Sequence, residues 1–252
     1  MDKIRISAVS YLNTKPFIYG IEKSGLINEV ELSLDNPNIC AKKLLENEVD
    51  LGLVPVTVIP KMKEHYIVSD FCIGADGTVD SVKLFSEVPL NEIEKIVLDY
   101  QSQTSVALAK ILAAKRWNIY PEFIEAKEGF EKNIFGKNGA VVIGDRALHM
   151  QGKFKYSFDL AGEWKELTGM PFVFACWISN KKLPDDFLKK FNQAIGKGVH
   201  EIPLLIREMK PENKNSIHVE DYLQNKISYT YDKRKKDALK LFLNYLKNLK
   251  QI

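Results

Sequence analysis

Cysteine and histidine are scarce in this chain, and neither is clustered. The three cysteines, Cys40, Cys72 and Cys176, lie far apart among apolar neighbours, a pattern that predicts reduced core residues. A metal site needs grouped ligands, and the four histidines show no ligand-like spacing. The sequence therefore predicts neither a metal nor another cofactor.

Long apolar runs and an excess of one charge are also missing. No stretch approaches the roughly 20 apolar residues of a membrane span, and the opening "MDKIRISAV" lacks a signal-peptide pattern. With 36 Lys and Arg against 33 Asp and Glu, the net charge of +3 offers no electrostatic basis for binding nucleic acid. We expect a cytoplasmic protein without membrane insertion; its oligomeric state is left open.

Strands and helices alternate through the first half of the chain. "KIRISAV", "VELSLD" and "DLGLVPV" read as strands, with helices predicted over 16–24 and from Pro37 onward. Pro16 suits a first helical turn, and Asn36 or Asn38 suits a cap. In the second helix we expect Ile39, Leu44 and Leu45 to point inward. This β-α-β-α-β order predicts a mostly parallel sheet covered by helices.

A second α/β set follows from about residue 93. Its strands are "EKIVLDY", "YPEFIEA" and "GAVVIGD", with a helix over "SQTSVALAKILAAKRW". Two extended runs, 72–89 and 171–179, are too long for ordinary connectors and read as strands that cross between lobes. Beyond residue 180 the chain reads as helical, with Gly196 and Gly198 ending one helix and Asp232 capping the last.

The expected fold is therefore α/β, with two lobes joined by two crossing strands. Lobe 1 is assigned residues 1–85 and 177–252, and lobe 2 residues 86–176, with a ligand cleft between them. Ligands in such folds bind at the carboxyl ends of strands and at helix N-termini. Four polar segments occupy such positions and supply the candidate site residues: Ser10, Tyr11 and Asn13; Ser81 and Val82; Ser102, Gln103, Thr104 and Ser105; Gly144 and Asp145.

The segment 102–105 carries the clearest signal for a ligand. A capping role explains Ser102 alone, whereas three hydroxyls in four positions at a helix start favour an anion site. Asn13 can donate and accept at once, or it can serve as a turn residue before Pro16. Asp145 is more typical of a helix cap than of a catalytic acid. Arg146 can pair either with a substrate carboxylate or near Asp145.

Several long segments together resemble the chorismate dehydratases of menaquinone biosynthesis. They are "VSYLNTKP", "DLGLVPV", "CIGADGTVDSVKLFS", "LDYQSQTSVAL", "VVIGDRAL" and "DLAGEWKELTGMPFVFACW", in this order, with a looser match at "YLQNKISYTYD". The resemblance covers residues 4–180 and implies a type II periplasmic-binding-protein fold. It also implies the first step of the futalosine route, in which chorismate becomes 3-[(1-carboxyvinyl)oxy]benzoate and water.

The resemblance further implies a division of roles. The substrate is a small dianion whose own enolpyruvyl carboxylate takes the proton, so the protein positions it without supplying a base. Asn13 matches the asparagine of the family's Y-L-N motif and would orient substrate and leaving hydroxyl. Carboxylates would be held by Ser81, Ser102, Thr104 and Ser105 with help from backbone N–H groups. Lys15 lies outside the fixed part of the motif.

Two alternatives share this fold. A solute-binding module would bind a ligand without chemistry, although an export signal is expected for that class. The sister enzyme that forms 1,4-dihydroxy-6-naphthoate uses other loop motifs, and "VSYLNTKP" favours the dehydratase. Incubation with chorismate distinguishes the solute-binding module from the dehydratase, because the module would bind chorismate without turnover.

Overall fold

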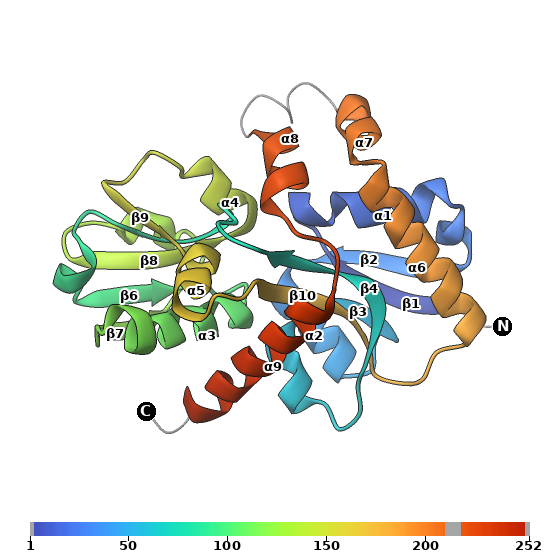
Figure 1. Cartoon of the computed structure of the whole chain (residues 1–252), viewed down its shortest axis with the longest axis horizontal. Helices are drawn as coiled ribbons and strands as arrows, with labels where there is room; N and C mark the ends of the chain where they lie inside the picture. The colour runs from blue at the N-terminus through green and yellow to red at the C-terminus, as the bar shows by residue number, and fades with distance from the viewer. Residues whose placement is uncertain (1–2, 210–217, 250–252) are drawn as a thin grey trace. The chain divides into compact units, whose positions relative to one another are not determined.

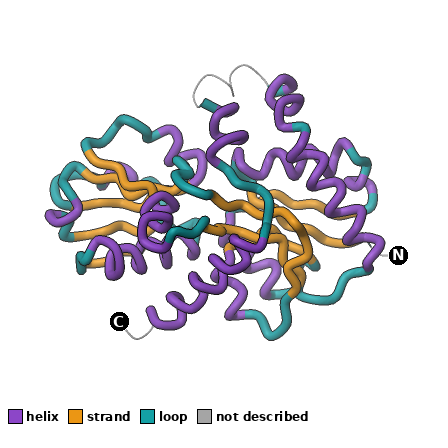
Figure 2. Tube along the Cα trace, viewed as in Figure 1, coloured by secondary structure: helices purple, strands orange, loops and turns teal. Residues whose placement is uncertain are grey.

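The computed structural model describes residues 3–209 and 218–249 of the chain (Figure 1). The chain divides into two compact units, Met1–Gly74 with Val173–Lys233, and Ala75–Phe172 with Arg234–Ile252. Each unit has its own five-stranded sheet, and helices alternate with the strands along the chain (Figure 2). The chain therefore passes from one unit to the other three times.

The sheet of unit 1 has the strand order β2-β1-β3-β10-β4. Both β2 and β3 pair with β1 in parallel, whereas β10 pairs with β3 antiparallel. The parallel β-α-β-α-β start predicted from the sequence is confirmed. The strands are β1 (Ile4–Val9), β2 (Val30–Asp35), β3 (Leu51–Pro55), β4 (Tyr66–Ala75) and β10 (Phe172–Ser179).

Local capping signals explain where the helices of unit 1 begin. Pro16 lies in the first turn of α1, and the Asn36 side chain accepts a hydrogen bond from the Ile39 N–H at the start of α2. The helices are α1 (Lys15–Lys23), α2 (Pro37–Leu45), α6 (Asp185–His200), α7 (Ile202–Glu208) and α8 (Val219–Asp221), with the short turns η1 (Leu12–Thr14), η2 (Leu26–Asn28), η3 (Val56–Lys61) and the π-helical η8 (Tyr222–Lys226).

The predicted inner face of α2 is partly wrong. Leu44 is fully buried, but Ile39 is 42% exposed and Leu45 is 37% exposed. The buried stripe instead follows Pro37, Cys40, Ala41 and Leu44. This spacing of three, four and seven residues is one helical face, and Ile39 and Leu45 lie beside it.

The predicted end of the helix at Gly196 and Gly198 is also wrong, because α6 continues to His200. Gly198 instead serves the close packing of α6 on α1 (Figure 1). A Cβ atom on Gly198 would lie 1.8 Å from the Pro16 carbonyl oxygen, and one on Gly20 would lie 2.0 Å from that of Ala194. Side chains are absent there because the two backbones touch.

The sheet of unit 2 has the order β7-β6-β8-β5-β9. Both β7 and β8 pair with β6 in parallel, whereas β8 and β9 pair with β5 antiparallel. Its strands are β5 (Val82–Ser86), β6 (Lys95–Leu98), β7 (Glu122–Glu125), β8 (Asn138–Ile143) and β9 (Tyr156–Asp159); its helices are α3 (Gln103–Leu112), α4 (Gly144–His149), α5 (Leu160–Thr168) and α9 (Lys233–Asn248), with η4 (Leu90–Glu92), η6 (Phe130–Asn133) and the π-helical η5 (Ala113–Trp117).

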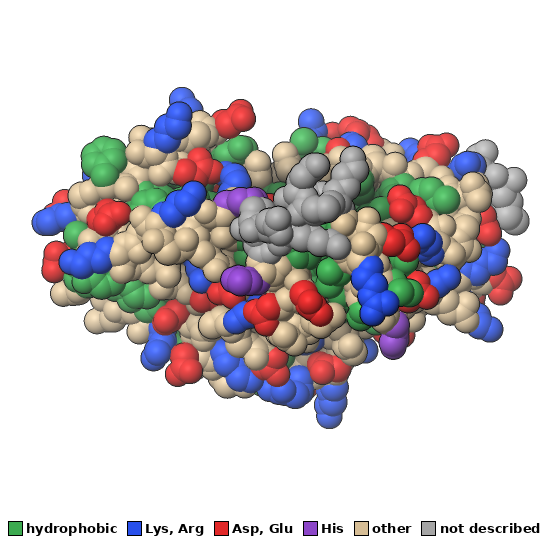
Figure 3. Space-filling model, turned by 90° about the horizontal axis from the view of Figure 1, so that it is seen from above, with side chains coloured by type: hydrophobic (Ala, Val, Ile, Leu, Met, Phe, Trp, Pro, Cys, Tyr) green, Lys and Arg blue, Asp and Glu red, His purple; other side chains and the backbone are tan. Residues whose placement is uncertain are grey.

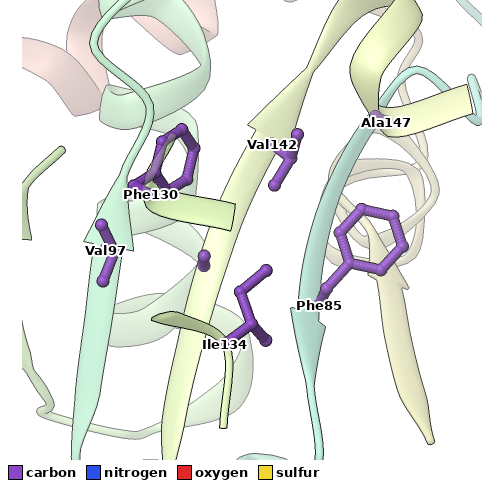
Figure 4. Close-up of a cluster of buried hydrophobic side chains, with 7 residues drawn as sticks. Phe85, Val97, Phe130, Ile134, Val142 and Ala147 are labelled. Carbon is purple, nitrogen blue, oxygen red and sulfur yellow. The ribbon is translucent and has the colours of Figure 1, made fainter. Parts of the chain in front are cut away.

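One face of this sheet carries a buried apolar cluster (Figure 4). Phe85, Val97 and Val142 come from three neighbouring strands, β5, β6 and β8. Phe130, which opens η6, and Ile134, which follows η6, cover them from the segment that precedes β8. Because β5, β6 and β8 lie next to one another in this sheet, the cluster packs the three strands together on one face.

The run 72–89, predicted as one crossing strand, is two strands. Its first residues end β4 in the sheet of unit 1, and β5 begins at Val82 in the sheet of unit 2. Asp80, between them, adopts φ +64, a left-handed conformation that breaks an extended run. The second run, 171–179, contains the single strand β10. The lobe boundaries predicted from the sequence differ from the two units, most clearly in that α9 belongs to unit 2.

The buried cysteines and the mixed charge of the surface agree with the predictions from the sequence. All three cysteines are buried and unpaired with each other, and burial raises the pKa of the Cys40 thiol to about 11. On the face seen in Figure 3, basic and acidic side chains are interspersed. No helix among the described residues is long and apolar enough to cross a membrane.

Asp50 joins three segments at the edge of the unit 1 sheet. Its carboxylate accepts hydrogen bonds from the Arg5 N–H at 3.0 Å and from the Arg5 guanidinium at 2.8 Å. Lys181 Nζ lies 2.8 Å from it as well. Burial alone would raise the pKa of Asp50, but these hydrogen bonds outweigh burial and hold its pKa well below the usual range.

We predict that Asp50→Asn lowers the free energy of unfolding at pH 7 by about 2 kcal/mol. Because the folded-state pKa is lowered, the carboxylate's contribution is full above the ordinary Asp pKa of about 4 and is lost as the pH falls below it. Urea denaturation of both proteins from pH 7 to pH 3 measures the difference. It should shrink toward pH 3, while the exposed control Glu48→Gln should show little difference at pH 7.

Candidate functional site

The first predicted segment follows β1 directly in unit 1. Ser10 is exposed, and its N–H donates to the Asp35 carbonyl at 2.9 Å, which continues the β1–β2 pairing by one residue. Tyr11 precedes the 3-10 turn η1, which carries Asn13 and leads into α1. The loop is thus held at both ends by regular structure.

Asn13 is 9% exposed and hydrogen-bonded on both sides of its amide. Its Nδ2 donates to the Tyr222 hydroxyl at 3.3 Å, and the Thr14 hydroxyl donates to its Oδ1 at 3.3 Å. The Tyr229 hydroxyl donates to the Asn13 backbone carbonyl at 3.0 Å. Among the described residues, these contacts use one of two Nδ2 hydrogens and one of two Oδ1 lone pairs. The amide can therefore still donate to and accept from a ligand.

In unit 2, Ser81 and Val82 lie at the start of β5 and are buried. The loop before them is held by Asp159, the N-cap of α5. The Asp159 carboxylate accepts hydrogen bonds from the N–H groups of Val79 at 3.0 Å and Asp80 at 2.6 Å. It also accepts from Ala161 and Gly162, so one side chain joins the loop to a helix start. Burial raises the pKa of Asp159, and these N–H groups oppose that shift.

The start of α3 has the geometry of a capped helix. Ser102 is the N-cap, and its hydroxyl accepts from the Ser105 N–H at 3.3 Å and lies 3.1 Å from the Ser105 hydroxyl. Thr104 is fully buried, whereas Gln103 is exposed. The capping interpretation of Ser102 is confirmed. The Ser102 hydroxyl is thus engaged within the helix start.

Arg146 pairs inside the protein. Its guanidinium lies 2.7 Å from an oxygen of Asp99, which is fully buried, and 2.5 Å from Glu131. Asp99 also accepts from the N–H groups of Gln101 and Ile143. Burial raises the pKa of Asp99, and Arg146 opposes that shift. Of the two roles considered for Arg146, the structure gives the internal ion pair, and with Asp99 rather than beside Asp145.

The interpretation of Asp145 as a helix cap is wrong. The N-cap of α4 is Ile143, which makes no side-chain cap, and Asp145 lies in the first turn. Gly144 begins α4 at φ +64, a conformation that favours glycine. Its N–H donates to the Ser81 carbonyl at 2.7 Å.

Strand pairing, a backbone hydrogen bond and the Asp99 carboxylate bring the three predicted segments of unit 2 together. The Ser81 carbonyl binds the Gly144 N–H, and Val82 pairs with Ile143 across β5 and β8. Asp99 then links Ile143 to the loop that leads into Ser102. Ser81 and the first residues of α3 and α4 therefore lie together as one polar cluster in unit 2. A second polar cluster, in unit 1, consists of Ser10, Tyr11 and Asn13.

Sequence reasoning missed Tyr222, Tyr229 and Asp159. Tyr222 and Tyr229 lie more than 200 positions from Asn13, and no local pattern connects residues so far apart. Asp159 does have a local signal, because an Asp directly before a helix is a typical N-cap. Within residues 3–209 and 218–249, no group of three His, Cys, Asp or Glu side chains could hold a metal ion.

Comparison with solved structures identifies the fold. A Candida albicans protein, described as defining a family with the generic periplasmic binding protein structural fold, is similar with a TM-score of 0.57 at 10% identity. The match covers 100% of this chain and 95% of that one. The two mixed α/β sheets are those of a periplasmic-binding-protein-like fold, as expected.

Two curated relatives are named chorismate dehydratase. The protein from Campylobacter jejuni is 28% identical over 251 residues, 96% of each chain. The protein from Thermus thermophilus is 31% identical over 160 residues, and this match spans 56% of the present chain and 58% of that protein.

The model of a family described as menaquinone biosynthesis matches residues 4–248. This range includes Asn13, Ser81 and the starts of α3 and α4. The chain therefore belongs to the menaquinone biosynthesis family.

Proposed function

We propose that this protein is a chorismate dehydratase that forms 3-[(1-carboxyvinyl)oxy]benzoate and water, the first step of the futalosine route to menaquinone. The observation that carries the proposal is the buried amide of Asn13, which is hydrogen-bonded on both sides and, counted over the described residues, keeps one donor and one acceptor for a ligand. The match to the Campylobacter jejuni relative along 96% of each chain supports it.

The proposed reaction removes the hydroxyl from C4 of the ring and the hydrogen from C3. The C3–H electron pair forms the new ring double bond as the hydroxyl leaves with its electrons, and aromatisation drives the step. The substrate's enolpyruvyl carboxylate takes the C3 proton and passes it to the departing hydroxyl. Water is released and the carboxylate is regenerated. An internal base of this kind needs a protein that fixes the reacting conformation.

Two buried carboxylates of unit 2 are consistent with a substrate that supplies its own base. Asp99 is tied to Arg146 and two backbone N–H groups, and Asp159 holds four backbone N–H groups. Either carboxylate would have to leave these partners to take a proton from a substrate, which would cost several hydrogen bonds. Positioning is therefore the role we assign to the protein.

Each unit contributes a set of proposed ligand contacts. In unit 1, Asn13 would orient the substrate and its leaving hydroxyl, with Ser10 and Tyr11 beside it. In unit 2, we assign substrate contacts to Ser81, Val82, Ser102, Gln103, Thr104, Ser105, Gly144 and Asp145. Among them, Ser81 and the hydroxyl-bearing start of α3 would hold the carboxylates. Because Thr104 is fully buried and the Ser102 hydroxyl caps α3, we assign to α3 the attraction of its positive N-terminal end for a carboxylate.

Incubation of the purified protein with chorismate tests the function. We expect chorismate to be lost and a benzoate to form whose mass is lower than that of chorismate by one water. Absorbance and mass spectrometry monitor both changes. Buffer without protein corrects for the spontaneous decay of chorismate.

A solute-binding module of the same fold is the second candidate, favoured by the similarity to periplasmic binding proteins. Saturable chorismate binding with no product would support the module and contradict the dehydratase.

A further inference from the structure

The segment that follows α8 reaches back to the Asn13 loop within unit 1. Residues 228–231 run antiparallel to β4, with the Cys72 N–H donating to the Tyr229 carbonyl at 2.7 Å and the Ser228 N–H donating to the Gly74 carbonyl at 2.8 Å. Phe71 and Thr230 form an isolated β-bridge in the same place. Tyr229 is thereby attached to the sheet by its own backbone.

The Tyr229 side chain is fixed as firmly as its backbone. It is 5% exposed, and its ring packs edge-on against Phe17 of α1 with 5.3 Å between centroids. Its hydroxyl donates to the Asn13 backbone carbonyl at 3.0 Å. Burial raises the pKa of Tyr229 well above its usual range, so the hydroxyl keeps its proton and remains a donor at neutral pH.

Tyr222 approaches the same asparagine from a different element. It opens the π-helical turn η8 and is 3% exposed. Its hydroxyl oxygen accepts from Asn13 Nδ2 at 3.3 Å. One tyrosine thus holds the main chain of Asn13 and the other holds its side chain, which together restrict both the position and the rotation of the amide.

We infer that Tyr222 and Tyr229 are positioning residues that hold the Asn13 amide in its productive orientation. This inference rests on the function proposed for Asn13. Neither hydroxyl is assigned a contact with substrate; each acts through Asn13. A buried amide held on both sides loses little entropy when it binds a ligand, which is the advantage of preorganisation.

Steady-state kinetics of Tyr222→Phe and Tyr229→Phe with chorismate test the inference. Each should lower kcat by about 10- to 100-fold, the size expected when a reacting group is misplaced, with a much smaller change in KM. The matched control is Tyr19→Phe, which removes a buried tyrosine hydroxyl that bonds Glu208 at 3.1 Å, away from Asn13. The control should keep wild-type kcat.

A double-variant cycle separates positioning from general damage. If Tyr222 acts through Asn13, adding Tyr222→Phe to Asn13→Ala should lower kcat no further. Multiplied effects of the two substitutions on kcat would overturn the inference.

A second readout does not depend on chorismate. With asparagine labelled by ¹⁵N, the Asn13 side-chain signals are assigned by their loss in Asn13→Ala. In Tyr222→Phe their hydrogen exchange should accelerate by about 10-fold or more, as the amide loses its buried acceptor, and in Tyr19→Phe it should not. Unchanged signals and exchange in Tyr222→Phe would overturn the inference. A wild-type protein that leaves chorismate intact would instead contradict the proposed function, and the exchange measurement would still decide the positioning role.

Discussion

Asn13→Ala should lower the turnover of chorismate by about 100-fold or more while the protein remains folded. The substitution removes a donor and an acceptor that stay available after the contacts with Tyr222 and Thr14 are counted. If those groups hold the leaving hydroxyl, their loss acts on the reaction step and lowers kcat more than it changes KM. Steady-state kinetics with chorismate measures both constants.

A stability control is needed, because the Asn13 amide also makes buried hydrogen bonds. Asn36→Ala removes the side-chain cap of α2, and caps contribute about 1 kcal/mol to stability. We expect this variant to match Asn13→Ala in its loss of stability but to keep wild-type turnover. Near-normal kcat in Asn13→Ala, or an equal loss of kcat in Asn36→Ala, would remove Asn13 from the reaction.

Features set by neighbouring residues were predictable from the sequence. Pro16 in a first helical turn, a cap at Asn36 or Asn38, of which the structure has Asn36, and Ser102 as a cap all depend on contacts within a few residues. The parallel start of the first sheet follows from the alternation of strands and helices. The motif segments also led to the correct family, because their order along the chain is a specific pattern.

Features set by distant partners were not predictable in the same way. Arg146 could have faced a ligand, and only the position of Asp99, 47 residues away, decides its direction. Ile39 was expected inside because it is apolar, although the buried face of α2 excludes it. The roles of Tyr222 and Tyr229 depend on a segment that returns to β4. A single sequence does not encode such long-range pairing in any local pattern.

Glycines in α6 were misread for a related reason. In a sequence, Gly196 and Gly198 look like a helix end, since glycine is the commonest residue at that position. In the structure Gly198 lies inside the helix, because a close approach to α1 leaves no room for a side chain. The partner that explains the glycine is Pro16, 182 residues earlier.

Gly198→Ala should therefore be strongly destabilising. The added Cβ would lie 1.8 Å from the Pro16 carbonyl oxygen and 2.9 Å from the Gly20 Cα, both backbone atoms that cannot turn aside. Alanine gains about 1 kcal/mol of helix propensity over glycine, but forced separation of the two helices should outweigh that gain. We expect a net loss of about 2–3 kcal/mol in the free energy of unfolding, measured by urea denaturation.

Gly196→Ala is the matched control, two residues away in the same helix. Its Cβ would meet only the tip of the Phe71 ring, at 3.1 Å, and a side-chain ring can shift. Helix propensity should then leave this variant close to wild type in stability or slightly above it. Since α1 begins at Lys15, directly after η1, separation of its first turn from α6 should also displace Asn13. The folded fraction of Gly198→Ala should thus show reduced kcat. Equal urea midpoints for Gly198→Ala and Gly196→Ala would contradict the backbone contact as the reason for a glycine at position 198.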